Sequence, residues 1–269
     1  CCEPAWRDPR LCRLVTSLAI VDPQSGERWL IEATPDLREQ LRLLDDVAGP
    51  ASSPGRTGLS GIFVTHAHIG HYSGLQTLGR EAVGDDAVPV YAMPRMQAFL
   101  RSGGPWSLLV DEQHIDLLAL KHNEPVQLNS RISVTPFLVP HRDEFSETVG
   151  FLIKGPARSI LFIPDIDKWE RWESRIEDEI LKHDIALLDG TFFADGEIPG
   201  RDISEIPHPF IEESMNRFGA LTAHQRARIR FIHLNHTNPA IDATSPAAHR
   251  VRRAGFGLAE QGERFPLGD

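Results

Sequence analysis

Three histidines lie close together in the sequence, and their spacing is its strongest chemical signal. His66, His68 and His71 come directly after a short apolar run at residues 61–64. Two imidazoles at positions i and i+2 of an extended loop can converge on one ion, and a third at the start of a helix can face a second ion nearby. A purely structural interpretation requires each of these polar rings to find its own buried partner. The pattern therefore predicts a metal site.

Three later apolar runs also end in side chains that bind metal ions. The strands expected at residues 131–139, 158–163 and 230–234 each run into histidine or aspartate. Taken alone, each of these side chains has a simpler explanation as a loop residue or a helix cap. Strand ends in a layered fold gather along one rim, however, so side chains distant in sequence can meet there. The candidates at these ends are His141, Asp165, His233 and His236.

The elements that would position these side chains alternate between strand and helix patterns. A hairpin is expected from residues 14–21 and 28–33, which flank a turn. Pro35 and Asp36 then open a helix whose apolar residues recur at helical spacing. Further strands are expected at residues 61–64, 88–92, 131–139, 148–153, 158–163, 185–188, 230–234 and 256–259, and further helices at 72–82, 94–101 and 245–254. Strand meanders with inserted helices indicate a layered sandwich with helices outside.

On these residues the sequence resembles the metallo-β-lactamase-fold hydrolases. The pattern Thr-His-x-His-x-x-His at residues 65–71, followed by a His, an Asp and a His on later strand ends, matches the order and spacing of that superfamily's metal motif. Within the superfamily, the sequence is similar to the branch of pyrroloquinoline-quinone biosynthesis protein B at residues 33–38, 139–144, 188–192 and 233–239. The resemblance implies an α/β (α+β) fold, the four-layer αβ/βα metallo-β-lactamase sandwich, as a single domain over residues 1–269.

The resemblance also implies which side chains hold which metal ion. The first ion would be held by His66, His68 and His141, the second by His71 and His236, with Asp165 bridging both. The chain departs from the superfamily at Gly70, where an aspartate usually binds the second ion. Glycine has no side-chain ligand, so the second site is expected to be weaker or to be completed differently. Asp36 is a candidate replacement, and it is equally well explained as the N-cap of the following helix.

Other polar residues near these strand ends are candidates for catalysis or for support of the ligands. Asp165 and His233 are the candidate catalytic residues, and His233 is also explained as a support for ligand side chains. Asp189 follows a strand and can orient a ligand histidine. His208 lies in a loop that can reach a substrate, although simple loop structure is the favoured explanation. Together with Asp36, both residues are further candidates as metal ligands.

The expected activity follows from the chemistry of divalent ions. Such an ion lowers the pKa of bound water to about 7, which supplies hydroxide near neutral pH. We expect one or two ions, with zinc favoured and iron or manganese as alternatives. The first hypothesis is hydrolysis of a small ester, lactone, amide or phosphodiester. The alternatives are an iron-dependent oxygenase or hydroxylase related to quinone cofactor biosynthesis, and a metal-binding protein without turnover. The intact His-x-His pattern favours hydrolysis over oxygenation.

Composition limits the partners. The chain has 269 residues with 28 Lys and Arg against 38 Asp and Glu, which gives a formal net charge of −10. Such a charge repels polyanions, so nucleic acid is not an expected partner and a small-molecule substrate is. No apolar run reaches the roughly 20 residues that cross a bilayer, so we expect a soluble protein, either cytoplasmic or periplasmic. The sequence leaves the oligomeric state open.

Cysteines cluster at the start of the chain. Cys1, Cys2 and Cys12 are the three cysteines, and the first residue is not methionine. The numbered chain is therefore interpreted as a processed or truncated product whose targeting segment is not visible. The cysteines are explained either as part of a structural zinc site or, preferably, as free or paired thiols at a frayed end.

Overall fold

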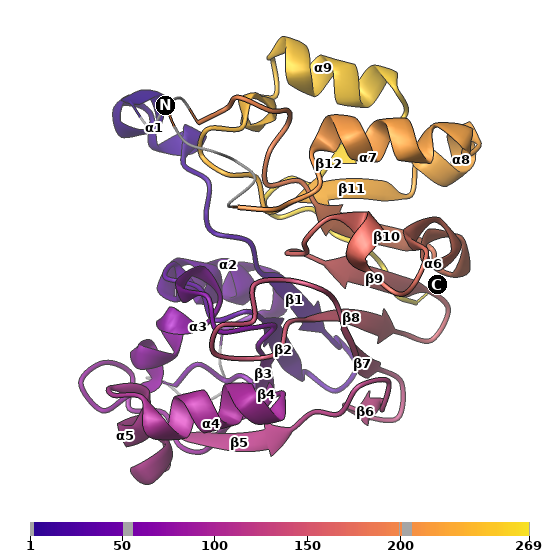
Figure 1. Ribbon diagram of the computed structural model, residues 1–269. Helices are drawn as coiled ribbons and strands as arrows, with labels where there is room; N and C mark the ends of the chain where they lie inside the picture. Colours follow the sequence, from indigo (N-terminus) through magenta and orange to yellow (C-terminus); the bar gives the residue numbers. More distant parts are fainter. Residues whose placement is uncertain (1–2, 51–55, 199, 201–205, 269) are drawn as a thin grey trace. The chain divides into compact units, whose positions relative to one another are not determined.

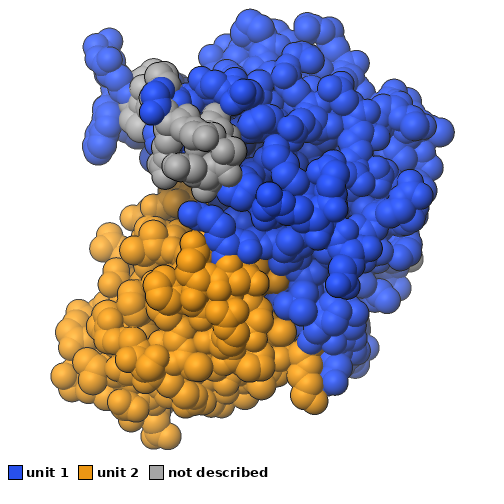
Figure 2. Space-filling model, viewed as in Figure 1, with its two compact units in different colours: residues 1–13, 122–142, 149–269 blue, residues 14–121, 143–148 orange. Residues whose placement is uncertain are grey.

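The computed structural model describes residues 3–50, 56–198, 200 and 206–268. The chain is a mixed α/β protein with two β-sheets, and its elements divide into two compact units (Figures 1 and 2). Unit 1 comprises Cys1–Arg13, His122–Arg142 and Val149–Asp269, and unit 2 comprises Leu14–Lys121 and Asp143–Thr148. Each unit contains one of the sheets, and each is described separately below.

The sheet of unit 2 has five strands in the order β1-β2-β3-β4-β5. These strands are β1 (Leu18–Val21), β2 (Arg28–Ile31), β3 (Gly61–Phe63), β4 (Val88–Ala92) and β5 (Ile115–Ala119). The pair β1–β2 is antiparallel, as the expected hairpin requires, and β2 to β5 are parallel. Because parallel strands end at the same edge, residues that follow β2 and β3 lie next to each other. Accordingly the N–H of Glu32 donates to the carbonyl of Phe63 at 2.8 Å.

Helices connect these parallel strands within unit 2. They are α2 (Leu37–Ala48), α3 (Ile69–Tyr72), the 3₁₀ helix η2 (Ser73–Leu78), α4 (Pro94–Ser102) and α5 (Trp106–Asp111). Helices α2 and α4 confirm the predictions made from Asp36 and Pro94, whereas sequence analysis assigned no element to α5 or to β5. Buried apolar side chains such as Leu37, Leu44 and Ile62 belong to one core cluster in this unit.

The prediction of a single α-helix over residues 72–82 is wrong. The structure has the short helix α3 followed by η2, which ends at Leu78. Gly74 donates its N–H to the carbonyl of Ala33 at 2.9 Å. A Cβ at Gly74 would lie 2.0 Å from the carbonyl oxygen of Thr34. This close approach of two backbones, which only glycine permits, takes the segment out of regular α-helical geometry.

The sheet of unit 1 has seven strands in the order β12-β11-β10-β9-β8-β7-β6. They are β6 (Val126–Gln127), β7 (Ser133–Leu138), β8 (Val149–Lys154), β9 (Ser159–Ile163), β10 (Ile185–Asp189), β11 (Ile229–Ile232) and β12 (Gly257–Leu258). Strands β9 to β12 are parallel, and β8 is antiparallel to both β7 and β9. Strand β7 therefore runs in the same direction as β9, β10 and β11, and all four end at one edge of the sheet. The expected strands of this region are confirmed to within a few residues.

Helices of unit 1 precede or follow these strands. They are α1 (Glu3–Arg7), η1 (Pro9–Leu11), η3 (Trp169–Arg171), α6 (Ile176–Lys182), α7 (Ile211–Arg217), η5 (Phe218–Ala220), α8 (Ala223–Arg226), η6 (Pro239–Ile241) and α9 (Pro246–Arg253). The N-cap of α9 is Ser245, whose hydroxyl accepts the N–H of Ala248 at 3.1 Å. The helix expected at the C-terminal end is thereby confirmed.

The sequence predictions on the cysteines and on membrane spans can be compared with the structure only over the described residues. Cys1 and Cys2 lie outside the described residues. Cys12 is exposed and has no disulfide partner among the described residues. Within the described part of the chain, no helix combines the length and the apolar character that crossing a membrane requires.

Candidate metal centre

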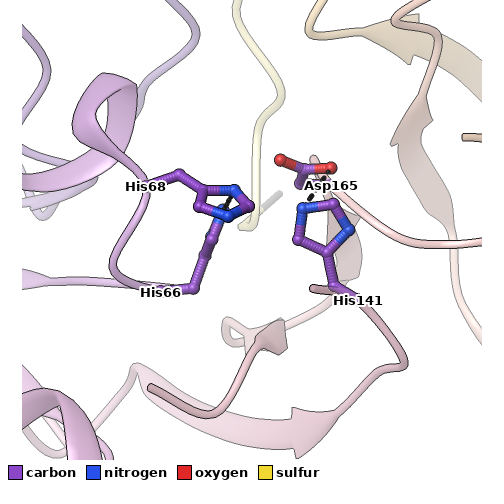
Figure 3. Close-up of side chains that lie close together, drawn as sticks. All are labelled: His66, His68, His141 and Asp165. Atoms are coloured by element: carbon purple, nitrogen blue, oxygen red, sulfur yellow. Dashed lines mark hydrogen bonds and ion pairs between the residues drawn. The ribbon is translucent and has the colours of Figure 1, made fainter. Parts of the chain in front are cut away.

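The first two histidines of the motif face each other in unit 2. Strand β3 leads into an extended segment that carries His66 and His68. Nε2 of His66 lies 2.8 Å from Nδ1 of His68, as the dashed line between their rings shows (Figure 3). Two ring nitrogens this close need a proton or a cation between their lone pairs. This pair of donor atoms fits two ligands of one metal ion.

A buried carboxylate orients His66 through a threonine. Glu32 is 0% exposed, and the hydroxyl of Thr65 donates a hydrogen bond to its Oε1. Because that hydroxyl proton is committed to Glu32, Oγ1 of Thr65 must accept the hydrogen bond that joins it to Nδ1 of His66, at 2.8 Å. The proton of His66 is thereby assigned to Nδ1, and the lone pair of the neutral ring to Nε2.

The other two histidines of the motif contact carboxylates directly. Nδ1 of His71 lies 3.1 Å from Oε1 of Glu32, so Glu32 serves two imidazoles. Nε2 of His68 lies 3.1 Å from Oε2 of Glu144. Histidines that bind metals commonly give their second ring N–H to a carboxylate or carbonyl, which fixes the tautomer. The donor set of unit 2 therefore fits metal binding.

Sequence analysis missed Glu32. It follows directly after β2, and its φ of 81° is in the left-handed region that non-glycine residues seldom adopt. Burial of a carboxylate and an unusual backbone both mark a residue whose position is set by function. The available signal was an apolar strand that ends in a charged residue, which is the same signal that identified Asp165.

In unit 1, strands β7 and β9 bring His141 and Asp165 together. Nε2 of His141 lies 3.3 Å from Oδ1 of Asp165 (Figure 3). The two side chains are only 1% and 4% exposed. Burial of a carboxylate together with an imidazole is costly unless the two are paired or coordinate an ion. This arrangement agrees with the expectation that the side chains after β7 and β9 lie close together.

The structure places His208 between two carboxylates. Its Nδ1 lies 2.8 Å from Oδ2 of Asp189 and 3.2 Å from Oδ1 of Asp165, and the three residues form a buried cluster in unit 1. Burial by itself lowers the pKa of His208, but the charges of Asp189 and Asp165 together raise it to about 9. His208 is therefore a buried, charged side chain rather than an ordinary loop residue.

Asp189 also orients His233 through a threonine. Its Oδ1 accepts hydrogen bonds from both the N–H and the hydroxyl of Thr191, at 2.9 and 2.7 Å. Oγ1 of Thr191 then accepts the hydrogen bond from Nδ1 of His233, at 2.8 Å. The lone pair of His233 is assigned to Nε2, as in His66. The φ of His233 is 61°, a second left-handed non-glycine backbone at a candidate site residue.

Two candidates from the sequence lie elsewhere. His236 is exposed in the loop after β11. The carboxylate of Asp36 accepts the N–H of Val15 at 2.7 Å, and Asp36 begins α2 without a side-chain capping bond. Neither residue belongs to a cluster of metal-ligating side chains in the part of the chain that the structure describes.

Position 70 has room for a side chain. Gly70 lies in α3, between His68 and His71. A Cβ built there would have Cγ1 of Val15 as its nearest neighbour, at 4.0 Å. The absence of an aspartate at this position is therefore not imposed by packing.

Comparison with known proteins identifies the class. The family described as "Beta-lactamase superfamily domain" matches residues 27–259, so the chain belongs to the beta-lactamase superfamily. The chain is 26% identical to coenzyme PQQ synthesis protein B of Xanthomonas campestris pv. campestris (strain B100), over 98% of this chain and 92% of that protein. It is also 26% identical to the protein of that name from Methylobacterium nodulans, over 99% of this chain and 92% of that protein. The resemblance predicted from the sequence is confirmed.

Solved structures show the same fold. Zn²⁺-bound PqqB from Methylobacterium extorquens has a TM-score of 0.79 and 22% identity, with 97% of this chain and 91% of that chain covered. A diphosphatase of the PhnP family has a TM-score of 0.61 and 22% identity, with coverage of 95% and 86%. The short form of human tRNase Z has a TM-score of 0.58 and 16% identity, with coverage of 96% and 94%. The predicted metallo-β-lactamase fold is confirmed.

Proposed function

We propose that this chain is a metal-dependent hydrolase that acts on a small ester, lactone, amide or phosphodiester. The observation that carries the proposal is the set of oriented imidazoles in unit 2. His66, His68 and His71 each direct one ring nitrogen toward Thr65 or a carboxylate, an orientation that suits the opposite ring nitrogen to metal binding. Membership of the beta-lactamase superfamily supports this interpretation.

The proposed ligand set follows the one that the resemblance implies, with one change. We assign His66, His68 and His141 to the first ion, Asp165 to a bridging position, and His71 to the second ion. We assign His233 to the place that the resemblance gave to His236, because His233 is oriented by Thr191 whereas His236 is exposed. Nitrogen and oxygen donors of this kind suit zinc, with iron and manganese as alternatives. When bound, such an ion lowers the pKa of a water molecule and polarises the oxygen under attack.

The chain's own residues would orient the reactants and move protons. Asp165 can accept a proton from a water molecule at its carboxylate. Nδ1 of His208 faces Asp189 and Asp165, so the other ring nitrogen, Nε2, can carry a proton for a leaving group. The substrate is proposed to be a small molecule, and the chain is proposed to act as one domain.

The proposal is tested with the full chain loaded separately with zinc, manganese and ferrous iron. Elemental analysis counts the bound ions, and a panel of esters, lactones, amides and phosphodiesters measures turnover. We expect one or two ions per chain and hydrolysis of at least one substrate class. His68→Ala should abolish hydrolysis and lower the metal content, because it removes one of the two facing donor atoms. Full activity in this variant would contradict the proposed centre.

A second candidate function follows from the relatives. The chain matches coenzyme PQQ synthesis protein B over 98% of its length, and that name belongs to cofactor biosynthesis. Ligands of histidine and carboxylate also suit ferrous iron in oxygenases. Consumption of dioxygen by the iron-loaded chain, without hydrolysis of any substrate in the panel, would favour this function. Bound metal without either activity would indicate a metal-binding protein.

A further inference from the structure

Two large apolar side chains are exposed beside the candidate metal ligands of unit 2. Ile69, which follows His68 in the chain, is 71% exposed, and Phe145, which follows Glu144, is 61% exposed. His68 and Glu144 are joined by the contact of 3.1 Å between Nε2 and Oε2. Each member of this pair is therefore followed by an apolar side chain that lies outside the buried core clusters.

The segment that carries Phe145 is held in place by polar contacts. The N–H of Ala67 donates to the hydroxyl of Ser146 at 2.8 Å, beside the motif itself. The hydroxyl of Thr148 donates to Oδ1 of Asp143 at 2.8 Å, and the guanidinium of Arg95 donates to the carbonyl of Asp143 at 2.9 Å. Contacts at both ends of a segment limit its conformations, so the exposure of Phe145 belongs to an ordered loop.

One side of the Phe145 ring rests on an aromatic cluster. Its centroid lies 5.5 Å from that of Phe99. The ring of Phe99 in turn lies 5.2 Å from Tyr72 and 6.1 Å from Trp106. Ring pairs at these separations attract each other and hold Phe145 in a defined orientation. The remaining surface of Phe145 is presented to solvent.

We propose that Ile69 and Phe145 bind an apolar acyl or aryl group of the substrate, next to the bond that is hydrolysed. This inference rests on the proposed function, because it takes the metal ligand His68 as the place of reaction. The carboxylate of Glu144 is one of the polar neighbours of His68, and the formal net charge of the chain is −10. Both features disfavour further anionic groups on the part of the substrate that lies away from the metal ions. The substrate class is therefore an uncharged ester or lactone with an apolar chain.

The test compares nitrophenyl acetate with nitrophenyl octanoate in the zinc-loaded full chain. Burial of one methylene changes affinity by about fourfold, so partial burial of the longer chain should raise kcat/KM by about tenfold or more. Phe145→Ser and Ile69→Ser should each reduce this preference by about threefold or more. Leu108→Ser is the matched control, because Leu108 is 50% exposed in α5 of the same unit. It should leave the preference unchanged.

A binding measurement separates this inference from the proposed function. Calorimetry measures the affinity of octylphosphonate and of methylphosphonate for the zinc-loaded chain. If no ester is hydrolysed but octylphosphonate binds about tenfold more tightly, and Phe145→Ser removes that difference, the hydrolase proposal fails and the apolar site stands. Equal affinities of the two phosphonates overturn the apolar site, as does a preference that persists in both variants.

A second copy of the chain is the other possible occupant of this surface. Analytical ultracentrifugation of the wild type and of Phe145→Ser distinguishes the two cases. We expect the same sedimentation for both proteins, because a substrate group and not a partner covers the ring. A wild-type dimer that Phe145→Ser converts to a monomer would overturn the inference.

Discussion

Oε1 of Glu32 lies 3.1 Å from Nδ1 of His71, although the two residues are 39 positions apart. The same carboxylate accepts the hydroxyl of Thr65, which contacts His66. One fully buried side chain therefore sets the tautomers of two histidines that we propose to bind different ions. The parallel pairing of β2 with β3 makes this possible, since it places Glu32 beside the end of β3.

Glu32→Gln should weaken metal binding by about 10- to 100-fold. Glutamine has nearly the same shape, but it lacks the negative charge that faces Nδ1 of His71 and accepts the hydroxyl of Thr65. Competition with a chromophoric chelator measures the zinc affinity of the variant and of the wild type. Glu39→Gln is the control, because Glu39 is an exposed residue of α2 in the same unit.

Two results would contradict the prediction for Glu32→Gln. If Glu32→Gln folds and retains zinc with the affinity of the wild type, the carboxylate does not orient the ligands. If Glu39→Gln loses as much zinc affinity as Glu32→Gln, the effect comes from the overall charge of the chain and not from the contact with His71.

An equivalent relay operates in unit 1, from Asp189 through Thr191 to His233. His233→Ala should therefore lower the metal content and reduce kcat by about 100-fold or more, as loss of an essential ligand does. His236→Ala should retain both, because the ring of His236 is exposed and no comparable relay reaches it among the described residues. Elemental analysis and turnover of the preferred substrate measure these effects. The reverse result, with His236 essential and His233 dispensable, would restore the ligand set that the resemblance implied.

The sequence predicted most of the fold because strand and helix patterns are local. Strands β4, β7 and β9 were recognised from apolar runs, and α2 from its helical spacing. Helix η2 was not, because the contact of Gly74 with the backbone near Thr34 joins segments that are distant in sequence. Local propensity carries no information about such a contact.

The site was predicted less completely than the fold, for a related reason. The motif of His66, His68 and His71 can be recognised from the spacing of its histidines within one short segment. The roles of Glu32 and His208 depend on which strands and loops lie next to each other, and that is decided only by the assembled sheets. The choice between His233 and His236, three residues apart, likewise depends on backbone dihedral angles that the sequence does not display.

The stability of the metal-free protein should depend on pH through His208. Its pKa in the folded protein is about 9, above the usual value of 6.5, because of Asp189 and Asp165. The ionic stabilisation is therefore fully present below about pH 6.5 and is lost as the pH rises through about 9. The shift corresponds to about 3 kcal/mol in the free energy of unfolding.

Urea denaturation of the chelated protein at several pH values measures this effect. The difference in unfolding free energy between the wild type and His208→Gln should shrink between about pH 6 and about pH 10. His224→Gln is the control, because His224 is an exposed histidine of α8. If the wild type and His208→Gln keep a constant difference across this range, His208 is not charged in the folded protein.

Gly70→Asp should increase the occupancy of the second metal position. The structure offers space for the side chain, since a Cβ at this position has no neighbour closer than Cγ1 of Val15 at 4.0 Å. An added carboxylate next to His71 supplies the anionic donor that hard and borderline divalent ions prefer. Elemental analysis after gel filtration measures zinc per chain, which should rise in Gly70→Asp but not in Gly70→Asn, where the neutral amide has nearly the same shape. An unchanged zinc content in Gly70→Asp would mean that position 70 does not face a metal, and that another ligand already completes the second site.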